Sequence, residues 1–183
     1  AFPEGRLDDP PLRAVHEAIE HVLRGHEPYP AVVVDARWEL VAANGAVPLL
    51  TRGAAAELLE PPVNVLRLSL HPRGLAPRIA NLAEWRAHLL ERLQREIEAS
   101  ADPALIALRD ELAGYPCPAA AARPDTRAIG VPLRLRAGDT VLSLFSTTTV
   151  FGTPRDVTLS ELAIESFYPG DEPTAEFLRH YAA

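Results

Sequence analysis

Residues 129–152 read IGVPLRLRAGDTVLSLFSTTTVFG, and they contain two strand patterns on either side of a turn. From 129 to 136, apolar residues alternate with glycine, proline and arginine, which is typical of a strand with one buried face. Pro132 indicates an edge strand or a bulge, because proline donates no ladder hydrogen bond. After a tight turn at 137–139, residues 140–152 are apolar or hydroxyl-bearing on both faces, which predicts a central strand.

Three further strands are predicted around this pair. AVVVD at 31–35 and ELVAA at 39–43 form two short strands, and Asn44 follows as the N-cap of a short helix. VTLSELAIESFYP at 157–169 is the last strand, with a bulge near Ser160 where its alternation slips. The order of helix, two strands, helices and three strands indicates an α+β fold with a five-stranded antiparallel sheet.

Residues 9–25 predict an amphipathic helix. Asp9 suits its N-cap, Pro10 its first turn and Gly25 its end. Its apolar residues fall on one face at helical spacing, and no other predicted element obviously covers them. We therefore expect this helix to contribute to a homodimer.

Two longer helices are predicted in the middle of the chain. Asn81, with Glu84 three residues further on, predicts a capping box ahead of a helix over 82–97 that has one apolar face. Asp102, which precedes a proline, predicts the start of a second helix that ends at Gly114.

Several charged residues near these elements are assigned to the surface. Arg92 and Glu96 stand four apart on the outer side of the 82–97 helix, which predicts a solvated ion pair. Glu161 and Glu165 flank the last strand, and we expect both to be exposed.

The composition is that of a water-soluble globular domain. The formal net charge of −7 opposes binding to phosphate backbones, since duplex affinity comes mainly from basic clusters. No apolar run is long enough for a membrane span. Cys117 is the only cysteine, which excludes an internal disulfide and agrees with a reducing, cytoplasmic location. The chain contains no methionine, so we expect it to be part of a longer protein.

No set of residues predicts catalysis, a cofactor or a metal. His16, His21 and His26 are spaced by five, which places them about 140° apart on a helix, so they do not converge on one ion. The hydroxyls of 146–149 and the carboxylate of Asp156 have no histidine near them in the sequence, and no G-x-S-x-G elbow is present. An enzyme is therefore not expected.

Residues 71–85, HPRGLAPRIANLAEW, have two interpretations. His71, Arg78 and Asn81 can capture an anionic group beside an apolar helix face. Alternatively, His-Pro is a turn, Gly74 a bend and Asn81 only a cap. The local pattern favours this second, structural interpretation.

A family resemblance adds to this pattern. The run NVLRLSLHPRGLAPRIANLAEWRAHLLERL, followed by DPALIALRDEL, is similar to the ligand-binding domain of MmyB-like transcription regulators. The most specific parts are Asn64 and Arg67 in an N-x-x-R motif, Trp85, the D-P-x-L-x-x-L-x-x-E-L run at 102–112, and ELAIESFYPGDEPT at 161–174. One departure is the segment YPCPAAAARPD, which stands where many members carry aromatic residues.

The resemblance covers about residues 30–178 and implies a fold, a domain arrangement and a sensing role. It implies a PAS-like sheet with helices on one face plus an N-terminal helix. Residues 1–27 would be a helix and linker from a missing helix-turn-helix domain of the XRE type, and 28–183 the ligand-binding domain. DNA would be bound only through that absent domain. The sensing role favours the pocket interpretation of residues 71–85.

We predict a pocket between the 82–97 helix and the sheet. It would take an elongated, mostly apolar and fatty-acid-like ligand, whose acidic head group would be held by Arg67 or Arg78. The predicted walls are Leu82, Trp85, Leu89 and Leu93 on the helix, and Phe145, Thr147 and Thr149 on the central strand. The alternative is a PAS-like protein-interaction module with a filled core; a ligand requires a volume of roughly 300 Å³ or more.

Overall fold

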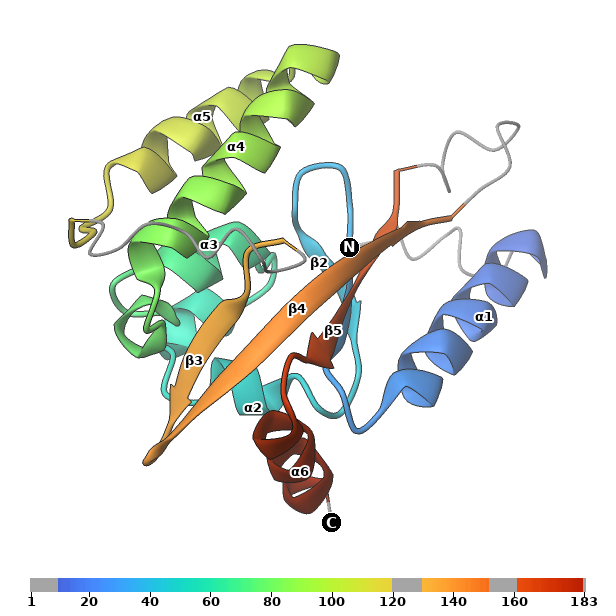
Figure 1. Cartoon of the computed structure of the whole chain (residues 1–183). Coiled ribbons are helices and arrows are strands. Elements are labelled where there is room, and N and C mark those ends of the chain that lie inside the picture. The colour runs from blue at the N-terminus through green and yellow to red at the C-terminus, as the bar shows by residue number, and fades with distance from the viewer. Residues whose placement is uncertain (1–9, 120–129, 152–160, 183) are drawn as a thin grey trace.

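The computed structural model describes residues 10–119, 130–151 and 161–182. Its described strands form one antiparallel sheet in the order β2-β1-β5-β4-β3, shown in Figure 1. The strands are β1 (Ala31–Val34), β2 (Leu40–Ala43), β3 (Leu133–Ala137), β4 (Thr140–Val150) and β5 (Ala163–Pro169). The α+β class and the PAS-like five-stranded sheet are therefore confirmed. The bulge predicted near Ser160 lies outside the described residues.

The strand order explains the two patterns in 129–152. β3 lies at the edge of the sheet, and Pro132 stands immediately before it, so the missing amide hydrogen costs no ladder bond. β4 pairs with β3 on one side and β5 on the other, which suits its two-sided apolar and hydroxyl composition. The turn between β3 and β4 contains Gly138 at φ 59°, a left-handed conformation that glycine adopts without strain.

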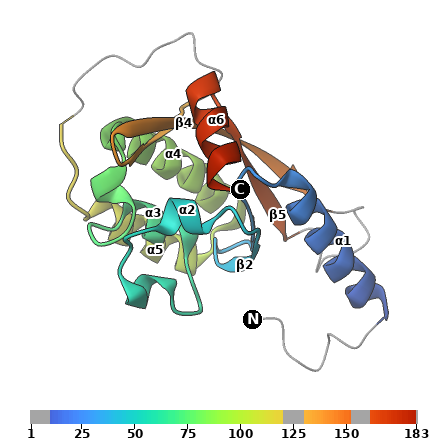
Figure 2. The same cartoon turned by 90° about the horizontal axis from the view of Figure 1, so that it is seen from below.

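The helices are arranged on both faces of the sheet. They are α1 (Pro10–His26), α2 (Pro48–Thr51), α3 (Val65–Leu70), α4 (Leu82–Ser100), α5 (Pro103–Ala113) and α6 (Glu172–Tyr181), with 3₁₀ turns at Ala56–Leu59 and Ala76–Arg78. Figures 1 and 2 show α2 to α5 on one face, α1 on the other, and α6 beside β4 and β5 near one end of the sheet. The predicted helices on one face, with an added N-terminal helix, are present.

The pleat of β1 divides the apolar residues between two cores. Val32 and Val34 face the helical layer and join the main core, whereas Ala31 and Val33 face α1. A smaller core on the α1 side contains Ile19, Leu23, Ala31, Val33, Leu162 and Ile164. The apolar face of α1 is thus covered by the sheet of its own chain. The interpretation that nothing covered it was wrong, because sequence periodicity does not identify the surface that a helix packs against.

Asn44 does not cap a helix. It is buried, and its side chain bridges four backbone groups instead. Its Oδ1 accepts from the N–H groups of Ala31 and Ala46, each at 3.2 Å. Its Nδ2 donates to the carbonyls of Leu23 at 3.0 Å and Tyr29 at 2.8 Å. The prediction of an N-cap was wrong, and Asn44 joins the end of α1 to the start of β1.

Asn81 stands at the N-cap position of α4 but makes no capping hydrogen bond. Its Nδ2 donates to the carbonyl of Pro132 at 2.7 Å, and its Oδ1 accepts from the N–H of Arg134 at 3.1 Å. The predicted capping box is therefore wrong, and Asn81 ties α4 to the edge strand. Asp102 does cap α5, accepting from the N–H of Ala104 at 2.9 Å, as predicted.

Candidate functional site

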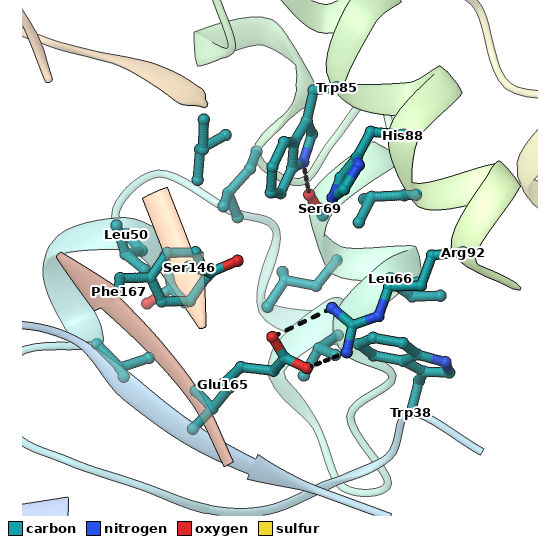
Figure 3. A pocket seen from close by; sticks show the side chains of 18 residues that line it. Trp38, Leu50, Leu66, Ser69, Trp85, His88, Arg92, Ser146, Glu165 and Phe167 are labelled. Carbon is teal, nitrogen blue, oxygen red and sulfur yellow. Dashed lines mark hydrogen bonds and ion pairs between the residues drawn. The ribbon is translucent and has the colours of Figure 1, made fainter. Parts of the chain in front are cut away.

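An apolar pocket lies between α3, α4 and the helix-covered face of the sheet, as Figure 3 shows. Its volume is about 100 Å³, and most of its wall is aliphatic or aromatic. That is less than the roughly 300 Å³ expected for a drug-sized ligand. The polar members of the wall are Thr51, Ser69, His88, Arg92, Ser146 and Glu165.

The two charged residues of the wall form an ion pair. Arg92 on α4 reaches Glu165 on β5 with both terminal nitrogens, and the distance from Nη1 to Oε2 is 3.2 Å. Glu165 is only 5% exposed. Thr148 completes the group, because its hydroxyl accepts from Arg92 at 3.0 Å and contacts a Glu165 oxygen at 3.1 Å. A buried carboxylate is thus satisfied by one guanidinium and one hydroxyl.

Trp38 lies against the same pair. The Arg92 guanidinium lies 4.6 Å from the centroid of its ring, within cation–π range. The indole Nε1 donates to Glu96 at 2.6 Å. Burial raises the pKa of the Glu96 carboxyl, although this bond and nearby Arg92 act in the opposite direction. Trp38 has a φ of 64°, which is uncommon outside glycine, so the turn holds a strained residue at the site.

Trp85, Ser69 and His88 form the opposite part of the wall. The indole Nε1 of Trp85 donates to the Ser69 hydroxyl at 3.0 Å, and its ring lies 5.5 Å from the His88 ring. Burial, and next the positive charge of Arg92, lower the pKa of His88. The lowered pKa favours the neutral form of the His88 imidazole.

A second hollow, of about 340 Å³, lies on the far side of the ion pair. It shares Trp38, Arg92 and Glu165 with the apolar pocket, but it extends toward the C-terminal end of α4. The ion pair therefore separates an apolar pocket from an acidic hollow. The other acidic residues of the hollow are Asp35, Glu96, Asp102 and Glu161.

Two of the four helix residues predicted for the ligand site line this pocket. Trp85 and Leu89 line the pocket. Leu93 is fully buried in the core beside it, and Leu82 packs against that core while partly exposed. The amphipathic stripe of α4 thus faces the core, and only its middle reaches the cavity.

The predicted strand wall was one residue out of register. Ser146 pairs with Phe167 across β4 and β5, and both side chains line the pocket. Neighbouring side chains on a strand point to opposite faces, so Phe145, Thr147 and Thr149 lie on the other face of the sheet. A strand that is apolar or hydroxyl-bearing on both faces does not indicate which face meets the helices.

Neither predicted head-group arginine lines the pocket. Arg67 pairs with Glu111, with 2.6 Å between Nε and Oε2, at a partly exposed site that joins α3 to α5. Arg78 donates to the carbonyls of Leu50 at 2.9 Å and Arg52 at 2.8 Å. Both side chains are engaged with protein groups elsewhere, and Arg92 occupies the inward position instead.

The predicted Arg92–Glu96 ion pair is present at 4.0 Å, but the surface assignments of Arg92 and Glu165 were wrong. Arg92 follows Trp85 by seven residues, a spacing that returns to the same face of a helix. Glu165 alternates with Ala163 and Phe167 on the face of β5 that is turned to the helical core. These spacings could have placed both residues on buried faces. Opposite charges on two buried faces would then have indicated an ion pair.

The stretch 71–85 is held by backbone contacts. His71 Nδ1 accepts from the N–H of Arg73 at 2.9 Å, as expected of a turn. Gly74 is needed because a Cβ there would lie 2.1 Å from the carbonyl oxygen of Leu68. With Arg78 and Asn81 also bonded to backbone groups, these contacts support the structural interpretation of the stretch.

Within the described ranges, no helix is long and apolar enough to cross a membrane. The same residues contain no group of three or more His, Cys, Asp or Glu side chains placed to hold a metal ion.

One comparison with known proteins gave a match. A family model described as the MmyB-like transcription regulator ligand binding domain matches residues 15–180. The match begins within α1 and ends within α6, so it includes every residue that lines the pocket. A search of curated proteins found no match.

Proposed function

The chain belongs to the family of MmyB-like transcription regulator ligand binding domains, and from that premise we propose that its α3–α4 pocket binds a small, mostly apolar effector. The observation that carries the proposal is a cavity with a mainly apolar wall and few polar groups, between the helices and the sheet. The role is sensing, without a catalytic step.

Pocket volume limits the effector in this conformation. An apolar cavity of about 150 Å³ in another protein accepts benzene, so about 100 Å³ suits a molecule of a few heavy atoms. A longer, fatty-acid-like chain would have to separate α4 from the sheet or pass the Arg92–Glu165 pair. An effector that binds one arrangement of α4 against the sheet more tightly than another would raise the population of that arrangement. It would thereby influence an attached DNA-binding domain.

The experiment substitutes tryptophan at two neighbouring leucines of α4. Leu89 lines the pocket, whereas Leu93, one turn further on, is fully buried and does not. In Leu89→Trp the larger ring fills free volume, so 1-butanol binding should be lost while stability changes little. In Leu93→Trp the core is overpacked, which should cost about 1–3 kcal/mol. NMR titration measures binding, and urea unfolding measures stability.

The small volume favours one second candidate, a PAS-like protein-interaction module without a ligand. That function predicts the same large loss of stability in Leu89→Trp and Leu93→Trp, and no saturable 1-butanol binding to the wild-type protein.

We also propose that the domain is a homodimer, whose two-fold symmetry suits a palindromic operator. Because Ile19 and Leu23 are covered within the chain, the outer face of α1 is the part available for contact, and Val22 is exposed there. We expect Val22→Arg to yield monomers in light scattering. Val141→Arg, at an equally exposed valine on β4, is the control that should leave the dimer intact. A dimer that persists in Val22→Arg would place the interface elsewhere.

A further inference from the structure

The pocket's charges already cancel. Arg92 and Glu165 are the charged residues of its wall and pair with each other, and Arg92 also lies 4.0 Å from Glu96 outside the wall. Burial lowers the pKa of His88, which favours its neutral form. An entering ligand therefore meets no charge that lacks a counterion.

An acidic ligand would be disfavoured at this wall. To reach Arg92, its carboxylate would have to displace Glu165, leaving a buried carboxylate without its guanidinium. The hollow behind the pair adds to the negative field. Of the four further carboxylates of the hollow, that of Asp102 binds Arg37 at 2.9 Å and that of Glu96 lies 4.0 Å from Arg92.

A cationic ligand meets the converse difficulty. An ammonium group that takes Glu165 would displace Arg92 from Thr148 and from the ring of Trp38. The guanidinium would then remain in a mostly buried position without its principal partner. A hydroxyl or carbonyl group carries no such penalty, because Ser69 and Ser146 present hydroxyls in the wall.

We infer that this pocket selects electrically neutral, mostly apolar effectors that carry one hydrogen-bonding group, and discriminates against carboxylates and amines. The inference rests on the proposed function and specifies its ligand class. It replaces the acidic head group predicted from the sequence, because the inward arginine already has a carboxylate partner.

The test compares three probes with the same four-carbon chain: 1-butanol, butanoate and butylammonium, titrated into the wild-type protein at pH 7 and followed by NMR. We expect 1-butanol to bind at least about tenfold more tightly than either ion, since an unpaired buried charge is costly. In Glu165→Gln the Arg92 charge loses its closest partner and keeps only Glu96, at 4.0 Å, so butanoate should tighten by at least about tenfold. Glu111→Gln makes the same change at the partly exposed Arg67 pair and should leave the order unchanged.

The outcomes separate the inference from the proposed function. Equal or tighter binding of butanoate or butylammonium to the wild-type protein overturns the inference alone. If none of the three probes binds, both the inference and the pocket proposal fail. If Glu165→Gln does not fold, the double variant Arg92→Gln/Glu165→Gln decides: a neutral wall should still prefer 1-butanol, and a preference for butanoate there overturns the inference.

Discussion

Replacing Arg92 with methionine is expected to lower the free energy of unfolding by about 3–5 kcal/mol, because it leaves Glu165 buried without a counterion. The Glu165 side chain is 7% exposed and that of Arg92 21%, so solvent screens the pair only weakly. Methionine keeps much of the aliphatic volume, so the loss reports mainly the charge and the ring contact with Trp38. Urea unfolding measures the change as a shift in midpoint.

Two further variants show whether burial is the cause. Arg92→Met/Glu165→Leu removes both charges and should recover most of the loss, since an apolar pair can replace a buried ion pair. Arg67→Met breaks the Glu111 pair, in which both side chains are 38% exposed, and should cost no more than about 1 kcal/mol. Similar losses in the two single variants would mean that the Arg92 pair behaves as a surface pair.

Local sequence patterns predicted which helices and strands form more reliably than they predicted which elements contact one another. The alternation in 129–152 located β3 and β4, because a half-buried strand leaves a period of two in the sequence. The same period did not identify the pocket face of β4, where apolar and hydroxyl residues occupy both sides. That face is set by pairing with β5, a long-range contact that β4's own sequence does not encode.

Asparagines illustrate the same limit at single residues. Asn44 and Asn81 both precede helical patterns, which fits a cap, yet each bonds to backbone groups outside its own helix. The C-terminal helix α6 was missed despite a local signal. Asp171 accepts from the N–H of Thr174 at 2.9 Å, and a proline lies in the first turn, the pattern that correctly located α5.

Replacing Asn44 with alanine is expected to lower the free energy of unfolding by about 3 kcal/mol. Each buried polar group left without a hydrogen-bond partner costs about 1–3 kcal/mol, and water that enters the site offsets part of the summed cost. The change frees the N–H groups of Ala31 and Ala46 and the carbonyls of Leu23 and Tyr29 from their side-chain partner. It thereby loosens α1 from the sheet as well as the start of β1. Urea unfolding measures the total loss.

Asn64 provides the matched control, because it is less buried, caps α3 by accepting from the N–H of Arg67 at 3.1 Å, and donates at an exposed site to the carbonyl of Arg37 at 3.0 Å. Asn64→Ala should cost about 1 kcal/mol, the usual value for a lost cap. Hydrogen exchange then localises the effect, since in Asn44→Ala the amide of Ala46 should lose protection while amides of α4 change only with global stability. If Asn44→Ala costs no more than Asn64→Ala and Ala46 stays protected, the Asn44 bridge does not hold α1 to the sheet, and the small core around Ile19 and Leu23 must do so alone.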